Sequence, residues 1–297
     1  ATGIALILGR GDGTFGQRLI FDEQEGPGGA AAGDFDEDGF LDLATTNFFA
    51  LESTISIHLG HGDGTFDKPA HLSVGRSPLG IVAGDFNEDG HVDLIDTNFG
   101  DKSISLLLGW GDGTFAPEIR METGRLPDSV RTMDLNGDGH LDVVVSNATE
   151  DNVSVFLGRG DGTFTDQARF RVGDGPTPRR GLDIADLNGD GWLDLAIPQV
   201  LPNDVSVLLG TGDGSFGAPQ RFPVGLGPVA LVADDFNGDG RLDVASVNPT
   251  TDTVAISLGH GDTTLQPAVL YAAGQAPVAI LRGDFNHDGR PDLVTAN

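Results

Sequence analysis

A nine-residue acidic pattern recurs six times at nearly constant spacing, and this recurrence limits the chain to a repeat architecture. The pattern reads Asp-x-(Asp/Asn)-x-Asp-Gly-x-x-Asp, and its copies begin at Asp34, Asp85, Asp134, Asp186, Asp235 and Asp284, 49 to 52 residues apart. A second pattern, GDGTF, has the same period and occurs at 11–15, 62–66, 111–115 and 160–164, with the variants GDGSF at 212–216 and GDTTL at 261–265. Two motifs that recur in phase indicate one structural unit of about 50 residues.

The segments between these motifs are short and of β type. In the repeat from Ser77 to Gly124 we expect four strands, at Ile81–Ala83, Val92–Ile95, Ile104–Leu108 and Glu118–Thr123. The GDGTF motif is expected to be a hairpin turn, because glycine adopts the positive φ that tight turns require. Repeats of this length with four short strands each are typical of propeller blades.

The two ends of the chain each supply part of a repeat. Residues 1–15 resemble the second half of a repeat, and the last residues complete the first half of another. We therefore predict an all-β fold with residues 1–297 in a single domain: a six-bladed β-propeller of four-stranded antiparallel blades. Pairing of Ile4–Leu8 with Asp292–Ala296 would close it and remove an open sheet edge.

The acidic loops have the spacing of a calcium site. Oxygen-bearing side chains at positions 1, 3, 5 and 9 suit a hard cation, glycine at position 6 permits a sharp turn, and position 7 would contribute its main-chain carbonyl. The predicted ligands are Asp34, Asp36, Asp38, Phe40 and Asp42 in loop 1; Asp85, Asn87, Asp89, His91 and Asp93 in loop 2; Asp134, Asn136, Asp138, His140 and Asp142 in loop 3; Asp186, Asn188, Asp190, Trp192 and Asp194 in loop 4; Asp235, Asn237, Asp239, Arg241 and Asp243 in loop 5; and Asp284, Asn286, Asp288, Arg290 and Asp292 in loop 6.

The alternative is that these residues merely cap turns, as Asp and Asn often do. Six copies with identical spacing, which hold 19 of the 45 acidic residues, favour metal binding. The loops are not EF-hands, because position 12 lacks the glutamate that an EF-hand requires. We expect about six Ca²⁺ per chain, bound most tightly by loop 1 with its four carboxylates.

Together with GDGTF and the preceding Gly-Pro segment, the acidic loop resembles the FG-GAP (VCBS-type) repeat, the unit of the integrin α-subunit propeller and of many secreted bacterial proteins. The resemblance covers essentially the whole chain. It implies a propeller whose loops between the first and second strands of each blade bind calcium. The best-known members have seven blades, whereas this chain accounts for six.

The charge balance narrows the choice of partners. The formal net charge of -28 disfavours nucleic acid and anionic membranes, and the absence of cysteine excludes thiolate metal sites and thiol catalysis. No apolar run is long enough to span a membrane. We expect a monomer that is secreted or exposed at the cell surface and binds a protein or glycan ligand.

Residues that break the repeat indicate where a ligand could bind. Two extra residues occur around Phe48 and Phe49, and three are inserted between Gly173 and Gly181, which brings in Arg179 and Arg180. Both insertions are predicted on the face opposite the calcium loops. The otherwise apolar inner strand also carries Asp128, Arg131 and Asp183, and the predicted ligand site consists of Phe48, Phe49, Asp128, Arg131, Arg179, Arg180 and Asp183. The alternatives are drift in exposed loops and, for Arg131 with Asp183, a structural ion pair.

These observations favour a recognition or adhesion module without enzymatic activity. A lectin is the second hypothesis, although the two Trp and one Tyr lie at non-equivalent places in the repeats. The third is a hydrolase or lyase with its site over the central channel. The fold itself does not decide among the three.

Overall fold

All regular structure in the described part of the chain is β-strand. The computed structural model describes residues 4–10, 14, 16–21, 26–173 and 181–297, and within them there is no helix, so none that could cross a membrane. The prediction of an all-β fold is therefore confirmed.

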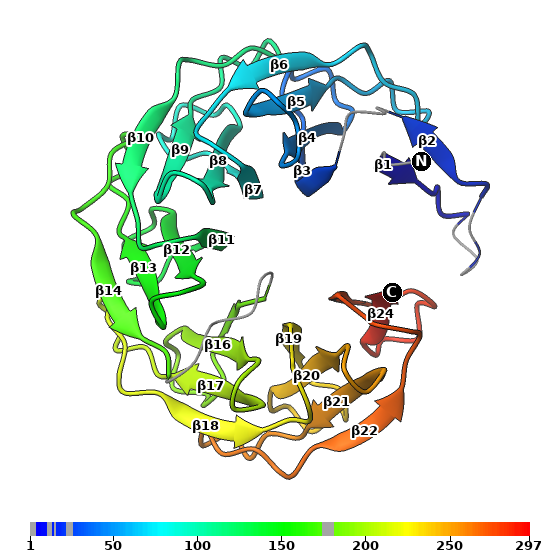
Figure 1. Ribbon diagram of the computed structural model, residues 1–297, viewed down its shortest axis with the longest axis vertical. Coiled ribbons are helices and arrows are strands. Elements are labelled where there is room, and N and C mark those ends of the chain that lie inside the picture. Colours follow the sequence, from blue (N-terminus) through cyan, green and yellow to red (C-terminus); the bar gives the residue numbers. More distant parts are fainter. Residues whose placement is uncertain (1–3, 11–13, 15, 22–25, 174–180) are drawn as a thin grey trace. The chain divides into compact units, whose positions relative to one another are not determined.

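Five four-stranded antiparallel sheets make up most of the structure (Figure 1). In each sheet the strands follow one another in chain order. The sheets consist of β3 (Pro27–Gly33), β4 (Asp42–Asn47), β5 (Thr54–His58) and β6 (Ala70–Ser73); β7 (Pro78–Gly84), β8 (Asp93–Asn98), β9 (Ser103–Leu107) and β10 (Ile119–Glu122); β11 (Pro127–Met133), β12 (Asp142–Asn147), β13 (Asn152–Phe156) and β14 (Ala168–Arg171); β15 (Asp183–Ala185), β16 (Asp194–Gln199), β17 (Asp204–Leu208) and β18 (Gln220–Pro223); and β19 (Ala230–Asp234), β20 (Asp243–Asn248), β21 (Thr253–Ser257) and β22 (Val269–Ala272).

Two further sheets have two strands each. Near the start of the chain, β1 (Ile4–Leu6) pairs with β2 (Leu19–Phe21), and at its end β23 (Ala279–Gly283) pairs with β24 (Asp292–Ala296). These are the two halves expected of a sixth blade. Their predicted pairing, and with it the count of six blades, stays a prediction.

The chain divides into two compact units. The first comprises residues 1–132, 140–145 and 156–167, and the second comprises residues 133–139, 146–155 and 168–297. The prediction of a single domain stays a prediction.

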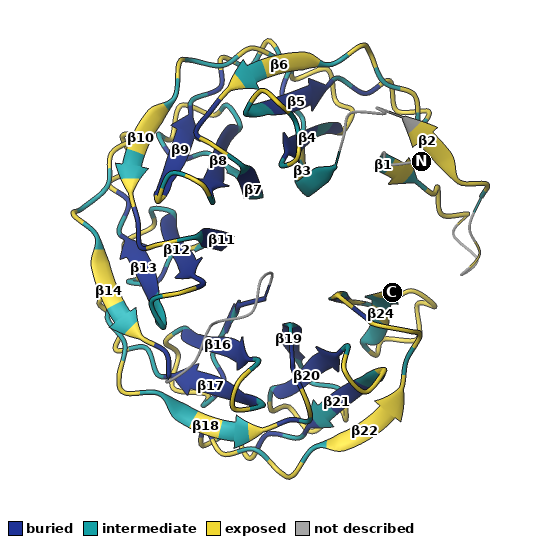
Figure 2. Cartoon of the chain, viewed as in Figure 1, coloured by how far each residue is buried: buried dark blue, intermediate teal, exposed yellow. Residues whose placement is uncertain are grey.

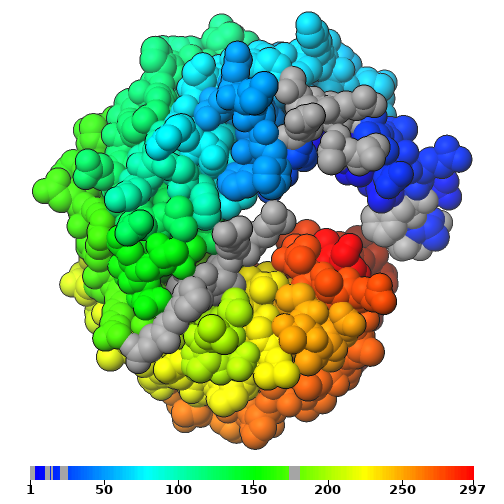
Figure 3. All heavy atoms as spheres, viewed as in Figure 1, coloured from blue at the N-terminus to red at the C-terminus, as the bar shows by residue number. Residues whose placement is uncertain are grey.

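The core lies between neighbouring sheets, because their middle strands are buried on both faces and contribute most of its apolar side chains. Strands β8 and β9 are buried along their whole length, whereas the outer strand β10 is largely exposed (Figure 2). In the first unit, side chains of sheet β3–β6 interlock with those of sheet β7–β10, and the space-filling view shows the two sheets in close contact (Figure 3). This cluster includes Phe35, Ile55, Val74 and Leu94. A matching cluster in the second unit joins β16–β18 to β19–β21 through Val205, Val224, Leu231 and Val244.

The GDGTF motif forms the predicted turn after the third strand. In the copy at 62–66, Gly60 bridges to Phe66, and the Asp63 carboxylate accepts hydrogen bonds from the Thr65 main-chain N–H and hydroxyl at 2.9 and 2.6 Å. Equivalent bridges occur at four further copies. Residues 11–13 and 15 of the first copy lie outside the described residues.

Candidate functional site

Each acidic loop joins the first strand of a sheet to the second, and it is held in shape by its own side chains. The position 1 carboxylate accepts the N–H of the position 6 glycine in all six loops, at 2.7 to 2.9 Å. That glycine has a φ of 82 to 92°, which favours glycine strongly. The position 5 carboxylate accepts the N–H of position 7 at 2.8 to 2.9 Å in loops 1, 2, 4, 5 and 6. Each loop therefore forms the predicted sharp turn, closed by hydrogen bonds to its own carboxylates.

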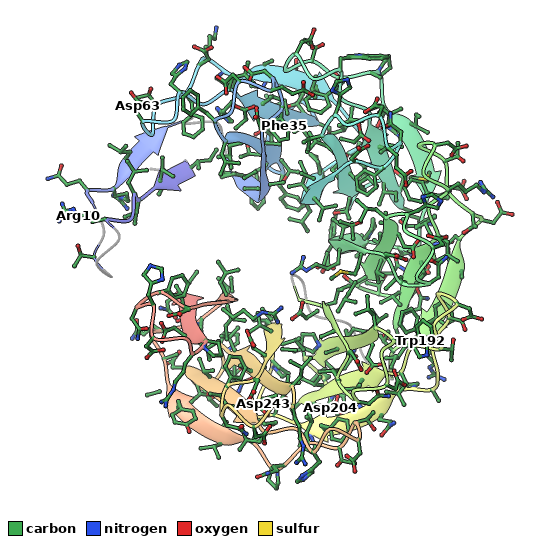
Figure 4. The ribbon with its side chains drawn as sticks, turned by 180° about the vertical axis from the view of Figure 1, so that it is seen from behind. Arg10, Phe35, Asp63, Trp192, Asp204 and Asp243 are labelled. Carbon is green, nitrogen blue, oxygen red and sulfur yellow. The ribbon has the colours of Figure 1, made fainter. Side chains whose placement is uncertain are left out.

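The aspartate at position 9 lies at the start of the second strand, is buried in loops 1 to 5 and partly buried in loop 6, and ties the loop to the rest of its sheet. In loops 1, 2, 4, 5 and 6 one carboxylate oxygen accepts the N–H of position 2, at 2.6 to 3.1 Å. The other oxygen accepts the N–H of the glycine after the third strand, at 2.7 to 2.9 Å in loops 1 to 5. Burial raises the pKa of Asp194 to about 6, and burial also raises the pKa of Asp243, which Figure 4 labels at the start of β20.

Loop 1 has the donor set that best suits a cation. Oxygens of Asp34, Asp36 and Asp42 lie within 4.8 Å of one another. In the same carboxylate group, Asp34 Oδ1 is shielded from solvent and has no hydrogen-bond partner. A carboxylate oxygen without a partner is costly to bury, and a bound hard cation would satisfy it. The residues present in loop 1 therefore fit calcium.

The six loops fall into two classes that the sequence analysis did not separate. In loops 1 and 2 position 4 is glutamate, and the Oδ1 atoms of Asp34 and Asp85 are buried without a partner. In loops 3, 4 and 5 position 4 is glycine, and its N–H donates to the equivalent Oδ1 at 2.7 Å. In loop 6 this oxygen accepts the N–H of Asp288 at 3.0 Å.

The asparagine at position 3 also lowers the number of carboxylate oxygens that have no hydrogen bond within the loop. In loops 2 to 6 its Nδ2 donates to the position 5 carboxylate at 2.8 to 3.1 Å. Loop 1 has Asp36 at this position and no such internal donor. A cation would have to compete with fewer internal hydrogen bonds in loop 1 than in the other loops.

The side chain at position 7 is not simply free to vary, as the sequence alone suggested. It packs on the first glycine of the GDG turn in the same repeat: a Cβ at Gly212 would lie 2.4 Å from Trp192 Cδ2, and a Cβ at Gly261 would lie 3.2 Å from Arg241 Cδ. In the first unit this side chain also contacts the preceding loop. His91 hydrogen-bonds Glu37 at 2.5 Å, and His140 hydrogen-bonds Glu88. The hydrogen bond to Glu37 raises the pKa of His91.

The aromatic residues of the predicted ligand site lie on the loop after β4. Phe48 packs edge-on against Phe49 and Phe99, with ring centroids 4.7 and 5.8 Å apart. Phe49 is 70% exposed and the neighbouring Leu51 is fully exposed, so an apolar patch lies on this loop. Arg179 and Arg180 lie outside the described residues.

The three inner-strand residues of the predicted ligand site make hydrogen bonds or ion pairs with neighbouring residues: Asp128, Arg131 and Asp183. Asp128 is buried and accepts the N–H of Ser129 at 2.6 Å, while Arg131 donates to the carbonyl of Val130. In the second unit Asp183 pairs with Arg282 at 3.1 Å and also accepts the N–H of Ala233 at 2.9 Å. An ion pair of Asp183 with Arg131, which belongs to the first unit, stays a hypothesis.

Comparison with known proteins identifies the repeats. The FG-GAP-like repeat family matches residues 48–95, 97–145, 134–197, 200–246 and 235–295. A search of curated proteins found no match. Among solved structures, BBS1N in complex with ARL6DN is 13% identical, with a TM-score of 0.60 over 95% of this chain and 79% of that one.

Two enzymes are similar to a comparable degree. The periplasmic gluconolactonase of Pseudomonas aeruginosa is 16% identical, with a TM-score of 0.59 over 90% of this chain and 72% of that one. The virginiamycin B lyase of Staphylococcus aureus, a catalytically inactive variant solved with quinupristin, is 14% identical, with a TM-score of 0.57 over 89% of this chain and 77% of that one. Identities this low support a shared β-propeller fold and nothing about activity.

Proposed function

The chain belongs to the FG-GAP-like repeat family, and on that premise we propose that it is a calcium-binding β-propeller that serves as an extracellular recognition module. The observation that carries the calcium proposal is the converging group of Asp34, Asp36 and Asp42 with its partnerless buried oxygen. Bound calcium would supply positive charge in the loop between the first two strands, and the oxygens of the loop would coordinate it.

Electrostatics supports the same proposal. The formal net charge is -28, and in loop 1 oxygens of three carboxylates lie within 4.8 Å of one another. Two unit charges 4 Å apart interact by about 4 kcal/mol at an effective dielectric constant of 20, so each divalent ion would relieve substantial repulsion. Calcium sites of extracellular modules typically have dissociation constants of about 10⁻⁴ to 10⁻³ M, which suits secretion or surface exposure.

The recognition role is supported by the patch formed by Phe48, Phe49 and Leu51. Phe49 and Leu51 are exposed and Phe48 packs beside Phe49. Exposed apolar side chains that lie together are typical of partner-binding surfaces, and aromatic residues often dominate binding energy. The partner would be a protein or a glycan. A comparison of wild type with Phe49→Ser on glycan arrays and protein-binding panels tests this role, which would be refuted if every interaction found were unaffected by the substitution.

The calcium proposal is tested by titration with Ca²⁺ in a calorimeter after chelation. We expect several sites, with the tightest abolished by Asp34→Asn. The matched control is Glu122→Gln, which removes one carboxylate from the exposed outer strand β10 and should leave calcium binding unchanged. An absence of heat at millimolar Ca²⁺, or equal loss in both variants, would refute the proposal.

A further inference from the structure

A polar cleft of about 480 Å³ lies within the second unit, between loop 4 and loop 5. Loop 4 contributes Asn188 and Gly189 to its walls, loop 5 contributes Arg241, and the turn after β21 contributes His260 and Gly261. The cleft thus brings a guanidinium and an imidazole together on the surface of a strongly acidic protein.

Arg241 has no acidic partner among the residues that the structure describes. Other arginines of the same unit pair with a nearby carboxylate: Arg221 pairs with Asp204 at 2.8 Å, and Arg282 pairs with Asp183 at 3.1 Å. Instead, its aliphatic stem packs on Gly261 and its head is exposed at the cleft. A guanidinium fixed by its stem is well placed to receive a carboxylate in bidentate fashion.

In the first unit the equivalent basic residues do have an acidic partner. There the basic residue at position 7 of one loop meets a glutamate at position 4 of the preceding loop: His91 meets Glu37, and His140 meets Glu88. In the second unit position 4 of loop 4 is Gly189, which lines the cleft and has no atom within 4 Å of where its Cβ would be. The second unit therefore has a basic side chain, Arg241, at position 7, but it has no carboxylate at position 4 of the preceding loop.

We propose that this cleft binds the side-chain carboxylate of a glutamate presented by a partner protein, which lies against Arg241 as Glu37 and Glu88 lie against His91 and His140. The inference rests on the proposed recognition function and names the chemistry of one partner contact. His260 provides a second donor, and the remaining lining consists of Asp186, Leu187, Leu242, Asn188 and glycine main chain.

Asp186, which lines the cleft, and Asp239 of loop 5 do not prevent a carboxylate from binding there. Asp186 already accepts the N–H groups of Gly189 and Gly191 at 2.7 and 2.9 Å, and Asp239 accepts the N–H of Arg241 at 2.9 Å. These carboxylates are directed into their own loops. Calcium in loops 4 and 5 would reduce their repulsion of an incoming anion, so binding should be stronger in the calcium-loaded protein.

The test is an NMR titration that follows the Arg241 Nε–H signal of the intact chain with saturating Ca²⁺. The probe is the capped peptide acetyl-Gly-Glu-Gly-amide, and its neutral counterpart carries Gln in place of Glu. We expect a saturable shift with the Glu peptide and none with the Gln peptide. The shift should persist at a reduced affinity after chelation.

Variants at two positions make the test specific. Arg241→Gln should weaken binding at least tenfold, read from the signals of His260 and Gly261. Gly189→Glu should also weaken it at least tenfold by rebuilding the internal carboxylate, whereas Gly189→Gln should leave affinity within twofold of wild type. Both substitutions impose the same main-chain strain, and Glu37 and Glu88 show that a side chain is accepted at this φ.

Equal shifts with the Glu and Gln peptides, or unchanged binding by Arg241→Gln, would overturn the inference. Binding of glucuronate but not of the Glu peptide would overturn the assignment of a protein partner. Calcium binding is measured separately by calorimetry on the same samples, so a failure of the calcium proposal is distinguishable from a failure of the carboxylate site.

Discussion

Asp96 is a buried carboxylate whose replacement should stabilise the protein, and the gain should grow with pH. It lies in β8, directly across from Ser105 in β9, and it is completely buried. Ser105 donates its hydroxyl to Glu118 at 2.7 Å, and neither oxygen of Asp96 has a hydrogen-bond partner. Burial raises the pKa of Asp96 well above the ordinary value of 3.8, with the charge of Glu118 adding to the rise and that of Arg120 opposing it.

The repeat itself suggests the substitution. The equivalent residues of two other repeats are Thr45 and Thr295, so threonine is compatible with this place in a sheet. A buried polar group without a partner costs about 1–3 kcal/mol, and Asp96→Thr should recover an amount of that order near neutral pH.

The pH dependence separates this explanation from a simple packing effect. Because the pKa is raised on folding, the folded state retains a proton that the unfolded state has lost above pH 3.8. The contribution of Asp96 to the stability of the wild type therefore falls as the pH rises from this value towards the folded-state pKa, by at most about 1.4 kcal/mol per pH unit. Asp96→Thr lacks this loss, so its advantage should be small at pH 4, increase with pH, and level off above the folded-state pKa.

Urea denaturation of both proteins at constant Ca²⁺ from pH 4 to 8 measures this difference. Effects of other titrating groups are common to both and cancel in the comparison. Glu122→Gln, on the exposed strand β10, provides a control whose difference from wild type should not vary with pH. An advantage of Asp96→Thr that is constant across pH, or a loss of stability, would refute the reasoning.

Three other perturbations test different parts of the structure. Chelation should lower the melting temperature, and Asp34→Ala should reproduce more of that loss than Asp235→Ala, whose Oδ1 already accepts an N–H in its loop; equal effects would contradict the two loop classes. Asp93→Ala should cost about 2–4 kcal/mol in urea denaturation because it leaves two buried N–H donors unpaired, and a change below about 0.5 kcal/mol would contradict its tying role. Phe35→Ala should cost about 3–5 kcal/mol since Phe35 is 2% exposed, whereas Phe49→Ser should leave the melting temperature unchanged; the reverse order would contradict the assignment of Phe49 to the surface.

The loops were predictable because their chemistry depends on residues close together in the chain. The spacing from Asp34 to Asp42 places the turn, its glycine and its carboxylates without knowledge of the fold. The same holds for the strands of the Ser77–Gly124 repeat, which the structure places at β7 to β10 within a few residues of the predicted bounds.

Contacts between repeats were not predictable in this way. The pairs of Glu37 with His91 and Glu88 with His140 join residues 54 and 52 positions apart, and only the side-by-side placement of loops reveals them. A signal was present nonetheless, since glutamate at position 4 is followed one repeat later by histidine at position 7. The exposed residues Phe48 and Phe49 were found as an insertion, but their packing against Phe99 depends on the neighbouring sheet.

A second missed feature is a buried amide at the end of the second strand. Asn47, Asn98 and Asn147 each donate from Nδ2 to a serine of the third strand, at 2.8 to 2.9 Å. The period of about 50 residues would have disclosed these asparagines. Their role is not evident from the sequence alone, because an asparagine after a strand is also a common turn residue.

The internal hydrogen bonds of the acidic loops bear on the order in which the protein matures. Because positions 1, 5 and 9 already hold the loop backbone through main-chain N–H groups, we expect the chain to acquire its shape before the ion arrives. Loading would then be a late and reversible step that requires little rearrangement, with on-rates limited mainly by dehydration of the ion. A change in the calcium concentration of the surroundings would in that case alter the lifetime of the folded protein while leaving its architecture unchanged.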